Sequence, residues 1–173
     1  MKKVEEKKTK NIILIIACLL LAVFIAMVIM SSSHRYKPSK KIVCFSNLRS
    51  LSIACLVFHR EKECWPGKDN WCESLQLPVN RYNQLRNYMQ CPADKIGPCS
   101  YAMNENIPAN ANELPDDLVL LFESAPGWNQ TGGADDVVTE RHSNPGANIA
   151  FPDGRVEFVK PEDVPNLRWT IEE

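Results

Sequence analysis

The most apolar stretch of the chain is residues 12–30, IILIIACLLLAVFIAMVIM, which contain no charge, glycine or proline. A run of about 20 apolar residues is long enough to cross the hydrocarbon core of a bilayer as a helix. A helix that packs in a soluble core keeps a polar stripe, and this run has none. We therefore expect residues 12–30 to form one transmembrane helix.

The polar segments on both sides of this run set its expected orientation. Residues 1–11 carry five Lys, and short Lys-rich flanks stay in the cytoplasm. Residues 31–41 form a polar junction that contains Pro38. The pattern favours a cytoplasmic N-terminus and a domain, residues 42–173, on the other side of the membrane.

Two forms of processing are the alternatives to an intact anchor. A cleaved signal peptide has a shorter apolar region that ends in a small-residue cleavage site, whereas this run ends Met-Ser-Ser-Ser. Residues 15–18, IIAC, match a lipoprotein cleavage box, but only six apolar residues precede Cys18 and twelve follow it. We favour an uncleaved anchor in which Cys18 is a small apolar residue.

Residues 42–63 have the periodicity of an amphipathic helix. Apolar side chains recur in the i, i+4, i+7, i+11, i+14 series of one helical face, at Cys44, Leu48, Leu51, Cys55 and Phe58. We expect this face to pack against a sheet.

The middle of the chain is less regular. Residues 80–90 indicate a short helix with Leu85, Tyr88 and Met89 turned inward. Residues 91–115 are rich in Pro, Asn and Ala and show little periodicity, so no element is predicted there.

Three segments further on are typical of strands. Residues 118–123, LVLLFE, indicate a buried strand, and residues 147–151 and 155–160 alternate between apolar and polar positions. Asp153-Gly154 lies between the last two segments, where glycine supplies the positive φ of a tight hairpin.

The expected fold class is therefore α+β: a transmembrane helix continues into an amphipathic helix that packs on a small antiparallel sheet. We also expect Leu167 and Trp169, in the last turn of the chain, to dock on the domain. About 130 residues beyond the junction fit one domain of ordinary size.

Six cysteines lie beyond the apolar run, and an even number in a small extracytoplasmic domain predicts disulfides. Cys91 and Cys99 enclose a short loop with Gly and Pro, and so do Cys64 and Cys72. We expect both pairs to be candidates and Cys91–Cys99 to be the favoured bond.

Cys44 and Cys55 share a face of the expected helix but lie three turns apart, so they cannot bond each other. They are either buried thiols, or one of them reaches a loop cysteine. Zinc is the competing interpretation of the cysteines. The chain has no C-x-x-C pair and no histidine at zinc-finger spacing, so we expect no metal or cofactor.

The net charge of −1 hides a split along the chain. Residues 31–104 hold 11 Lys and Arg against 5 Asp and Glu, and residues 105–173 hold 4 against 14. The two parts could meet in neighbouring copies or form two solvated faces. Because the Lys and Arg are dispersed and the largest charge block is acidic, we expect no nucleic-acid partner.

Four blocks occur in a fixed order: residues 44–49 (CFSNLR) with 64–67 (CWPG), 91–94 (CPAD) with 100–104 (SYAMN), 118–123 (LVLLFE), and 141–157 (RHSNPGANIAFPDGRVE). In these blocks the chain resembles the pilin-like proteins of planctomycetes and verrucomicrobia, which are similar to type II secretion pseudopilins and type IV pilins. The last block is similar to that family's C-terminal signature, a His and an Asp-Gly nine residues apart.

The signature residues here are His142, Asn148, Asp153 and Gly154, with ten residues rather than nine between His142 and Asp153. The prepilin cleavage motif of pilins, similar to Gly-Phe-Thr-Leu-x-Glu, is missing, because the apolar run has neither glycine nor an acid.

The resemblance implies a pilin-like fold and a non-enzymatic, membrane-anchored subunit of a cell-envelope assembly or protein secretion apparatus. It implies a single-pass protein of a bacterial inner membrane, with its domain in the periplasm or outside the cell and with protein partners in the envelope. The alternative is a solitary anchored binding domain that does not polymerise, which the missing cleavage motif favours.

A catalytic triad and a calcium site are two further interpretations of the sequence. His142 lies beside Ser143 and near Asp153, but the chain has no Gly-x-Ser-x-Gly motif and adjacent side chains need not converge. We therefore expect no catalytic residue.

Calcium is the other candidate ligand. Two acidic pairs, Asp116–Asp117 and Asp135–Asp136, are weak candidates for binding this cation. Acidic loops are more often simply solvated, so no metal is expected there either.

Overall fold

The computed structural model describes residues 2–32, 38–76, 88–94, 96–108 and 111–171. The chain divides into two compact units, Met1–Lys37 and Pro38–Glu173. The division falls inside the polar junction expected at 31–41.

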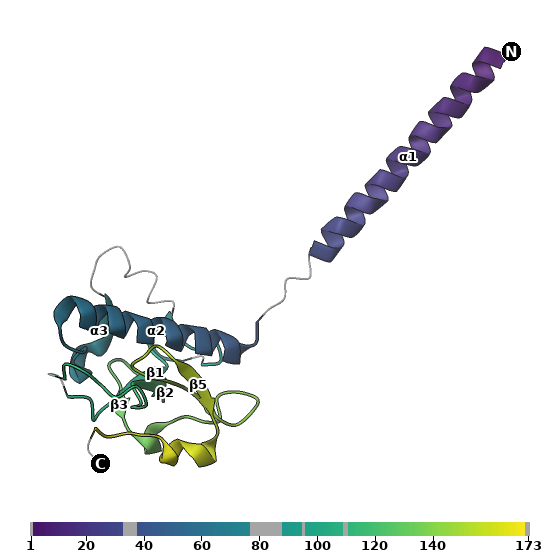
Figure 1. Cartoon of the computed structure of the whole chain (residues 1–173). Helices are drawn as coiled ribbons and strands as arrows, with labels where there is room; N and C mark the ends of the chain where they lie inside the picture. Colours follow the sequence, from purple (N-terminus) through teal and green to yellow (C-terminus); the bar gives the residue numbers. More distant parts are fainter. Residues whose placement is uncertain (1, 33–37, 77–87, 95, 109–110, 172–173) are drawn as a thin grey trace. The chain divides into compact units, whose positions relative to one another are not determined.

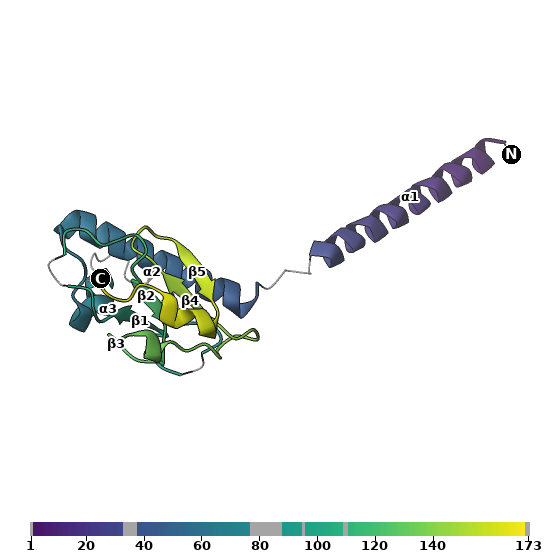
Figure 2. The same ribbon diagram turned by 60° about the horizontal axis from the view of Figure 1, so that its bottom comes forward.

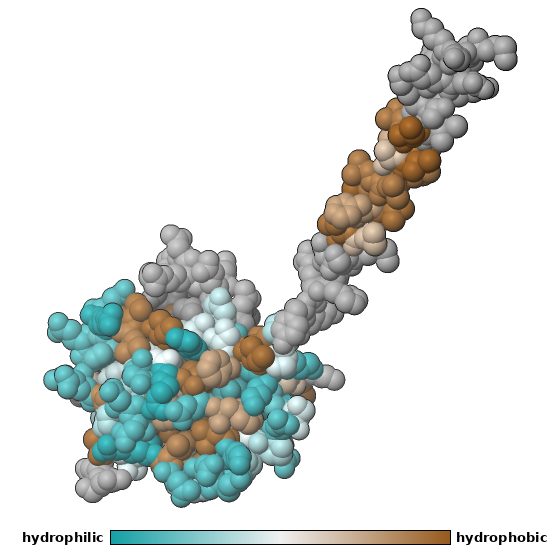
Figure 3. All heavy atoms as spheres, turned by 45° about the vertical axis from the view of Figure 1, so that its right-hand side comes forward, coloured by the Kyte–Doolittle hydropathy of each residue, from teal (hydrophilic) through white to brown (hydrophobic). Residues whose placement is uncertain are grey.

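The first unit is a single helix, α1 (Lys2–Ser32), which contains the apolar run (Figure 1). The large apolar side chains between Ile13 and Val28 are all exposed, with Leu20 at 66%. Figure 3 shows this part of α1 as an almost unbroken apolar surface. The helix therefore has no buried face of the kind that a soluble core helix would have.

The second unit begins with α2 (Lys40–Lys62), close to the helix expected at 42–63. The Ser39 side chain caps it by accepting a hydrogen bond from the amide of Ile42 at 3.3 Å. The expected face is the buried one, with Cys44, Leu48 and Leu51 fully inaccessible to solvent. The prediction of an amphipathic helix packed on a sheet is confirmed.

Among the described residues, α2 is the one helix whose length and composition would allow it to cross a membrane, while Ile13–Val28 is a shorter apolar helix. The apolar face of α2 is already covered, because the helix packs against three of the strands described next. Its hydropathy is that of a core helix.

The sheet has five strands in the order β3-β1-β2-β4-β5. The strands are β1 (Tyr101–Asn104), β2 (Leu121–Glu123), β3 (Thr131–Gly132), β4 (Ala147–Ala150) and β5 (Val156–Val159). Short helices complete the unit: η1 (Lys68–Asn70), α3 (Trp71–Gln76), η3 (Ala134–Asp136) and η4 (Pro161–Asn166). Figure 2, in which the sheet comes forward, shows α2 behind the strands.

Both faces of the sheet are buried. Side chains at alternate positions, such as Tyr101, Met103 and Leu121, pack with α2 in one core cluster. The intervening residues, such as Ala102 and Phe122, pack in a second cluster on the other face. Leu167 and Trp169 join that second cluster, as expected.

The expected strands are present, but the sheet is larger than predicted. Residues 118–123 contribute β2, and 147–151 and 155–160 form the antiparallel β4–β5 hairpin. The prediction of a purely antiparallel sheet is wrong, because β1 pairs with β3 in parallel. Neither β1 nor β3 was predicted.

The short helix expected at 80–90 lies mostly outside the described residues, and Leu85 is among those not described. Of the two other residues expected to face inward, Met89 is fully buried, whereas Tyr88 is exposed.

Candidate functional site

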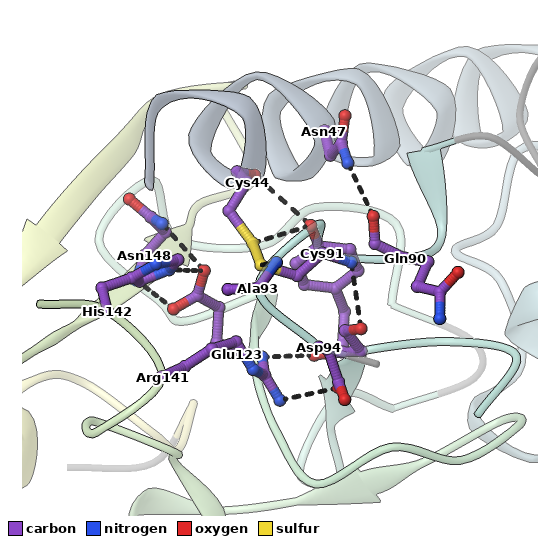
Figure 4. Close-up of a disulfide and its surroundings, with 12 residues drawn as sticks. Cys44, Asn47, Gln90, Cys91, Ala93, Asp94, Glu123, Arg141, His142 and Asn148 are labelled. Atoms are coloured by element: carbon purple, nitrogen blue, oxygen red, sulfur yellow. Dashed lines mark hydrogen bonds and ion pairs between the residues drawn. A yellow bond between two sulfur atoms is a disulfide. The ribbon is translucent and has the colours of Figure 1, made fainter. Parts of the chain in front are cut away.

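A group of polar and sulfur-containing side chains is buried between α2 and the sheet. Five residues meet there, which we call the Glu123 cluster: Cys44, Cys91, Glu123, His142 and Asn148 (Figure 4). They come from α2, a loop before β1, the end of β2, a loop before β4, and β4 itself. The cluster thus joins α2 and two loops to the neighbouring strands β2 and β4.

Glu123 is the centre of the cluster. It is fully buried and lies on the α2 side of the sheet because it alternates with Phe122, which faces the other way. Asn148 on the neighbouring strand donates to Glu123 twice, from Nδ2 to Oε1 at 2.8 Å and from its backbone amide to Oε2 at 3.3 Å. A buried carboxylate needs such partners, since leaving it bare is costly.

His142 completes the coordination of Glu123. Its Nε2 lies 2.9 Å from Glu123 Oε1, and both side chains are almost inaccessible to solvent. The loop that carries His142 is closed by a hydrogen bond from the amide of Gly146 to the carbonyl of Thr139 at 2.7 Å. Gly146 has φ +140°, and a Cβ there would lie 2.6 Å from the carbonyl oxygen of Val159, so this tight return to the sheet requires glycine.

Arg141, next to His142, fixes the same loop from the other side. Its guanidinium donates to the carbonyls of Ser100 and Ser124 and forms an ion pair with Asp94 at 3.3 Å. Both side chains of this pair are largely buried. Arg141 therefore connects the His142 loop to β1, β2 and the loop after Cys91.

A disulfide links α2 to this network. Cys44 and Cys91 are bonded, with their Cα atoms 5.1 Å apart. Tyr101 lies beside the bond, its hydroxyl 3.3 Å from Cys44 Sγ. Burial, reinforced by the charge of Glu123, raises the pKa of Tyr101, so this hydroxyl stays neutral.

The expected disulfide pairs are not the ones observed. Cys91 bonds Cys44 rather than Cys99, so the prediction of Cys91–Cys99 is wrong. Cys64, Cys72 and Cys99 are all free thiols, so a Cys64–Cys72 bond is not present either. The physical reason is that α2 packs against the loop that holds Cys91. This long-range contact places Cys44 next to Cys91, and the spacing of cysteines within a loop cannot indicate such a contact.

The Glu123 cluster also contains a possible set of metal ligands. One atom each of Cys44, Cys91, Glu123 and His142 lie within 4.8 Å of one another. Two sulfurs, an imidazole and a carboxylate are a donor set that zinc accepts. The sulfurs are joined to each other, however, and a disulfide offers no thiolate, so these residues could ligate a metal only after reduction of the bond.

The candidate calcium ligands do not converge. Asp117 pairs with Arg168 at 3.2 Å, and Asp136 accepts from the amide of Gly133 at 2.9 Å within η3. Among the described residues, the acidic pairs 116–117 and 135–136 are not part of a group with metal-binding geometry. Asp117 thus links its loop to the C-terminal segment, and Asp136 stabilises the start of η3.

Ser143 does not pair with His142. Nε2 of His142 lies against Glu123, and Ser143 is exposed at the surface. In the part of the chain that the structure describes, the side-chain partner of His142 is this carboxylate rather than a hydroxyl or a thiol.

A shallow pocket of about 370 Å³ lies above the cluster, lined by Ser39, Lys40, Lys41, Ala93, Arg141, His142, Ser143 and Asn144. Its cationic groups come mainly from the first residues of α2. Lys41 stacks over the ring of Phe158 at 3.2 Å, and Arg141 is engaged with Asp94. The pocket is basic, and two of its cationic side chains, Lys41 and Arg141, already have partners within the domain.

The remaining signature residues form the β4–β5 turn. Asp153 Oδ1 accepts from the amide of Arg155 at 2.8 Å, and Gly154 has φ +85°, as the hairpin prediction requires. The four signature residues therefore have two separate structural roles. His142 and Asn148 hold Glu123, while Asp153 and Gly154 close the hairpin.

Sequence reasoning missed Glu123 itself. It lies in the buried strand predicted at 118–123, but no role was predicted for it. The signal that could have found it is that residues 118–122 are continuously apolar, which predicts a strand buried on both faces. A carboxylate inside such a strand needs partners of the kind that His142 and Asn148 provide.

Comparison with known proteins returned no match: the chain matches no family model, no curated protein and no solved structure. The proposal for its function therefore rests on the sequence and the geometry of this chain.

Proposed function

We propose that this protein is a non-enzymatic, membrane-anchored, pseudopilin-like subunit of a bacterial envelope assembly or secretion apparatus. In this proposal α1 spans the inner membrane, its N-terminus lies in the cytoplasm, and the unit Pro38–Glu173 lies on the other side.

The observation that carries the proposal is the exposed apolar surface of α1. Sixteen consecutive residues, 13–28, are uncharged, and their large side chains are exposed. Exposing such a helix to water is unfavourable, because the transfer of each CH₂ group from water to an apolar environment is favourable by about 0.8 kcal/mol. A bilayer is the environment that such a surface fits.

The Glu123 cluster supports a role in architecture. Its Glu123 and His142 side chains are partners of each other, and the neighbouring Arg141 and Asp94 side chains form a pair beside them. The disulfide Cys44–Cys91 bonds α2 to the loop that precedes β1. A helix that is held by a disulfide and a buried hydrogen-bond network forms a rigid body with the rest of the domain. A subunit that must hold its neighbours in an assembly in fixed positions needs such rigidity.

The test of anchoring is alkaline carbonate extraction of membranes from cells that express the full chain. Wild type should stay in the membrane pellet. Leu20→Arg places a charge at the centre of the apolar run and should move a large share of the protein to the supernatant. Lys8→Arg, which keeps the charge of the flank, is the matched control and should behave as wild type. Complete extraction of the wild type would end the proposal.

A second candidate is a solitary anchored binding domain. The observation in its favour is that the apolar run of α1, residues 12–30, has neither the glycine nor the acid that pilin-type processing and assembly use. Cross-linking in the native membrane separates the two functions. Ladders of this chain, or links to components of a secretion apparatus, support the subunit, whereas links to one soluble ligand alone support the binding domain. Mass spectrometry of the mature N-terminus in the same sample reports whether α1 is cleaved.

A further inference from the structure

Two of the free cysteines are immediate neighbours in the core. Cys72 is on α3, and Cys99 directly precedes the residues that lead into β1. Both are fully buried in the same core cluster. The thiols of Cys72 and Cys99 lie close enough to influence each other, which raises the pKa of Cys72 and lowers that of Cys99.

Independent contacts hold both residues in place. The loop before β3 reaches each of them. The amide of Gly127 donates to the carbonyl of Cys99 at 2.9 Å. Asn129 accepts from the amide of Cys72 at 2.9 Å through Oδ1 and donates its own amide to Cys72 Sγ at 3.4 Å. The loop that contains Gly127 and Asn129 thus contacts both cysteines. These hydrogen bonds hold the two residues near each other independently of their thiols.

We propose that Cys72 and Cys99 form a second disulfide in the mature protein. The proposal rests on the extracytoplasmic location proposed above, because a bond of this kind persists in an oxidising compartment. Together with Cys44–Cys91, it would tie the two helices of the domain to the segments around β1.

The reaction is an exchange with a disulfide of the thiol–disulfide oxidoreductase class. One thiolate attacks the acceptor disulfide and releases one of its sulfurs as a thiol. The second thiolate then displaces the mixed disulfide and releases the other sulfur. Two cysteine thiols become one disulfide, and the acceptor disulfide becomes two thiols, so two electrons and two protons pass to the acceptor.

The burial of both sulfurs sets the time of this exchange. Because both cysteines are inaccessible in the finished fold, the exchange takes place while the domain is still folding.

The other cysteines do not compete for these two. Cys91 is occupied by Cys44. Cys55 lies within α2, where burial raises the pKa of its thiol. Cys64 is partly exposed after the end of α2. We expect Cys55 and Cys64 to remain thiols, together with Cys18.

The experiment is peptide mapping of the full chain taken from its native envelope. Free thiols are alkylated under denaturing conditions, so that burial protects none of them, and the protein is then digested without reduction. Trypsin is well suited, because Lys and Arg separate the six cysteines beyond α1 onto six different peptides. The expected result is two linked pairs, Cys44–Cys91 and Cys72–Cys99.

Alkylation of both Cys72 and Cys99 would overturn the proposal, and so would a Cys91–Cys99 link. The state of Cys44–Cys91 in the same map tells which claim has failed. If that bond is intact, the second disulfide alone is wrong. If it is reduced as well, the compartment is reducing, and the proposed location of the domain fails with it.

Two variants sharpen the result. In Cys99→Ser, the Cys72 thiol should become fully alkylatable while Cys44–Cys91 stays bonded; a blocked Cys72 in this variant would contradict the proposed pairing. Cys55→Ser is the matched control, another buried cysteine of the same core, and it should leave both links unchanged.

Discussion

The two long helices of this protein both carry many apolar residues, but their surroundings are opposite. α2 gives its apolar face to the sheet, with Leu48 and Leu51 fully buried. α1 exposes the large apolar side chains of residues 13–28. By length and composition α2 would also be long and apolar enough to cross a membrane, yet its apolar face already has a protein partner. A core helix has polar residues on the side opposite its apolar face, whereas a membrane helix is apolar on all sides.

The largest effect is expected from the polar layer beneath α2. Glu123→Ala leaves His142 and Asn148 buried without their acceptor, and should lower the free energy of unfolding by about 3–5 kcal/mol. Denaturant titration of the detergent-solubilised chain, followed by tryptophan fluorescence, measures this, because all four Trp lie in the second unit.

Glu157→Ala is the matched control for that titration. Glu157 is an exposed glutamate of β5 that pairs with Arg155, and its loss should change the free energy of unfolding by about 0–1 kcal/mol. Equal effects of the two substitutions would show that the Glu123 cluster does not stabilise the fold.

The comparison of the helices can be tested directly with one leucine from each. Leu48→Ala opens a cavity in the core and should cost about 2–5 kcal/mol of unfolding free energy. Leu20→Ala shortens an exposed side chain of α1 and should leave the unfolding of the domain unchanged in the same titration. A loss of stability in Leu20→Ala as large as in Leu48→Ala would contradict the assignment of α1 to a separate unit.

The smallest effect is expected at the start of α2. Ser39→Ala removes the cap on the amide of Ile42 and should cost about 1 kcal/mol. Ser50→Ala is the control within the same helix, since its hydroxyl bonds back to the carbonyl of Ser46 and alanine is the better helix former. Its titration should show no loss, and a loss as large as that of Ser39→Ala would argue against the cap.

Sequence periodicity predicted the elements in which local pattern and burial agree. The α2 helix shows a clear apolar face, and the β4–β5 hairpin carries Asp153-Gly154 at its turn. β1 was missed because all four of its residues are buried, so no alternation marks it. β3 was missed because two residues, Thr131–Gly132, are too few to show a pattern.

The candidate site was harder to predict, because its contacts join residues far apart in the sequence. Cys44 and Cys91 are 47 positions apart, whereas local spacing favoured loops of eight. The partner of His142, which lies on a loop, is Glu123 on β2, 19 positions away. Such contacts follow from how α2 and the His142 loop pack on the sheet, and no local pattern encodes them.

The most direct test of the proposed anchor compares the reactivity of two cysteines with a membrane-impermeant maleimide. Cys18 is exposed on α1 and Cys64 is partly exposed on the domain. In spheroplasts that express the full chain, the account predicts that Cys64 is labelled from outside. It also predicts that Cys18 stays unlabelled even after lysis, because the bilayer covers it. Labelling of Cys18 in lysed membranes, or labelling of Cys64 only after lysis, would contradict the account.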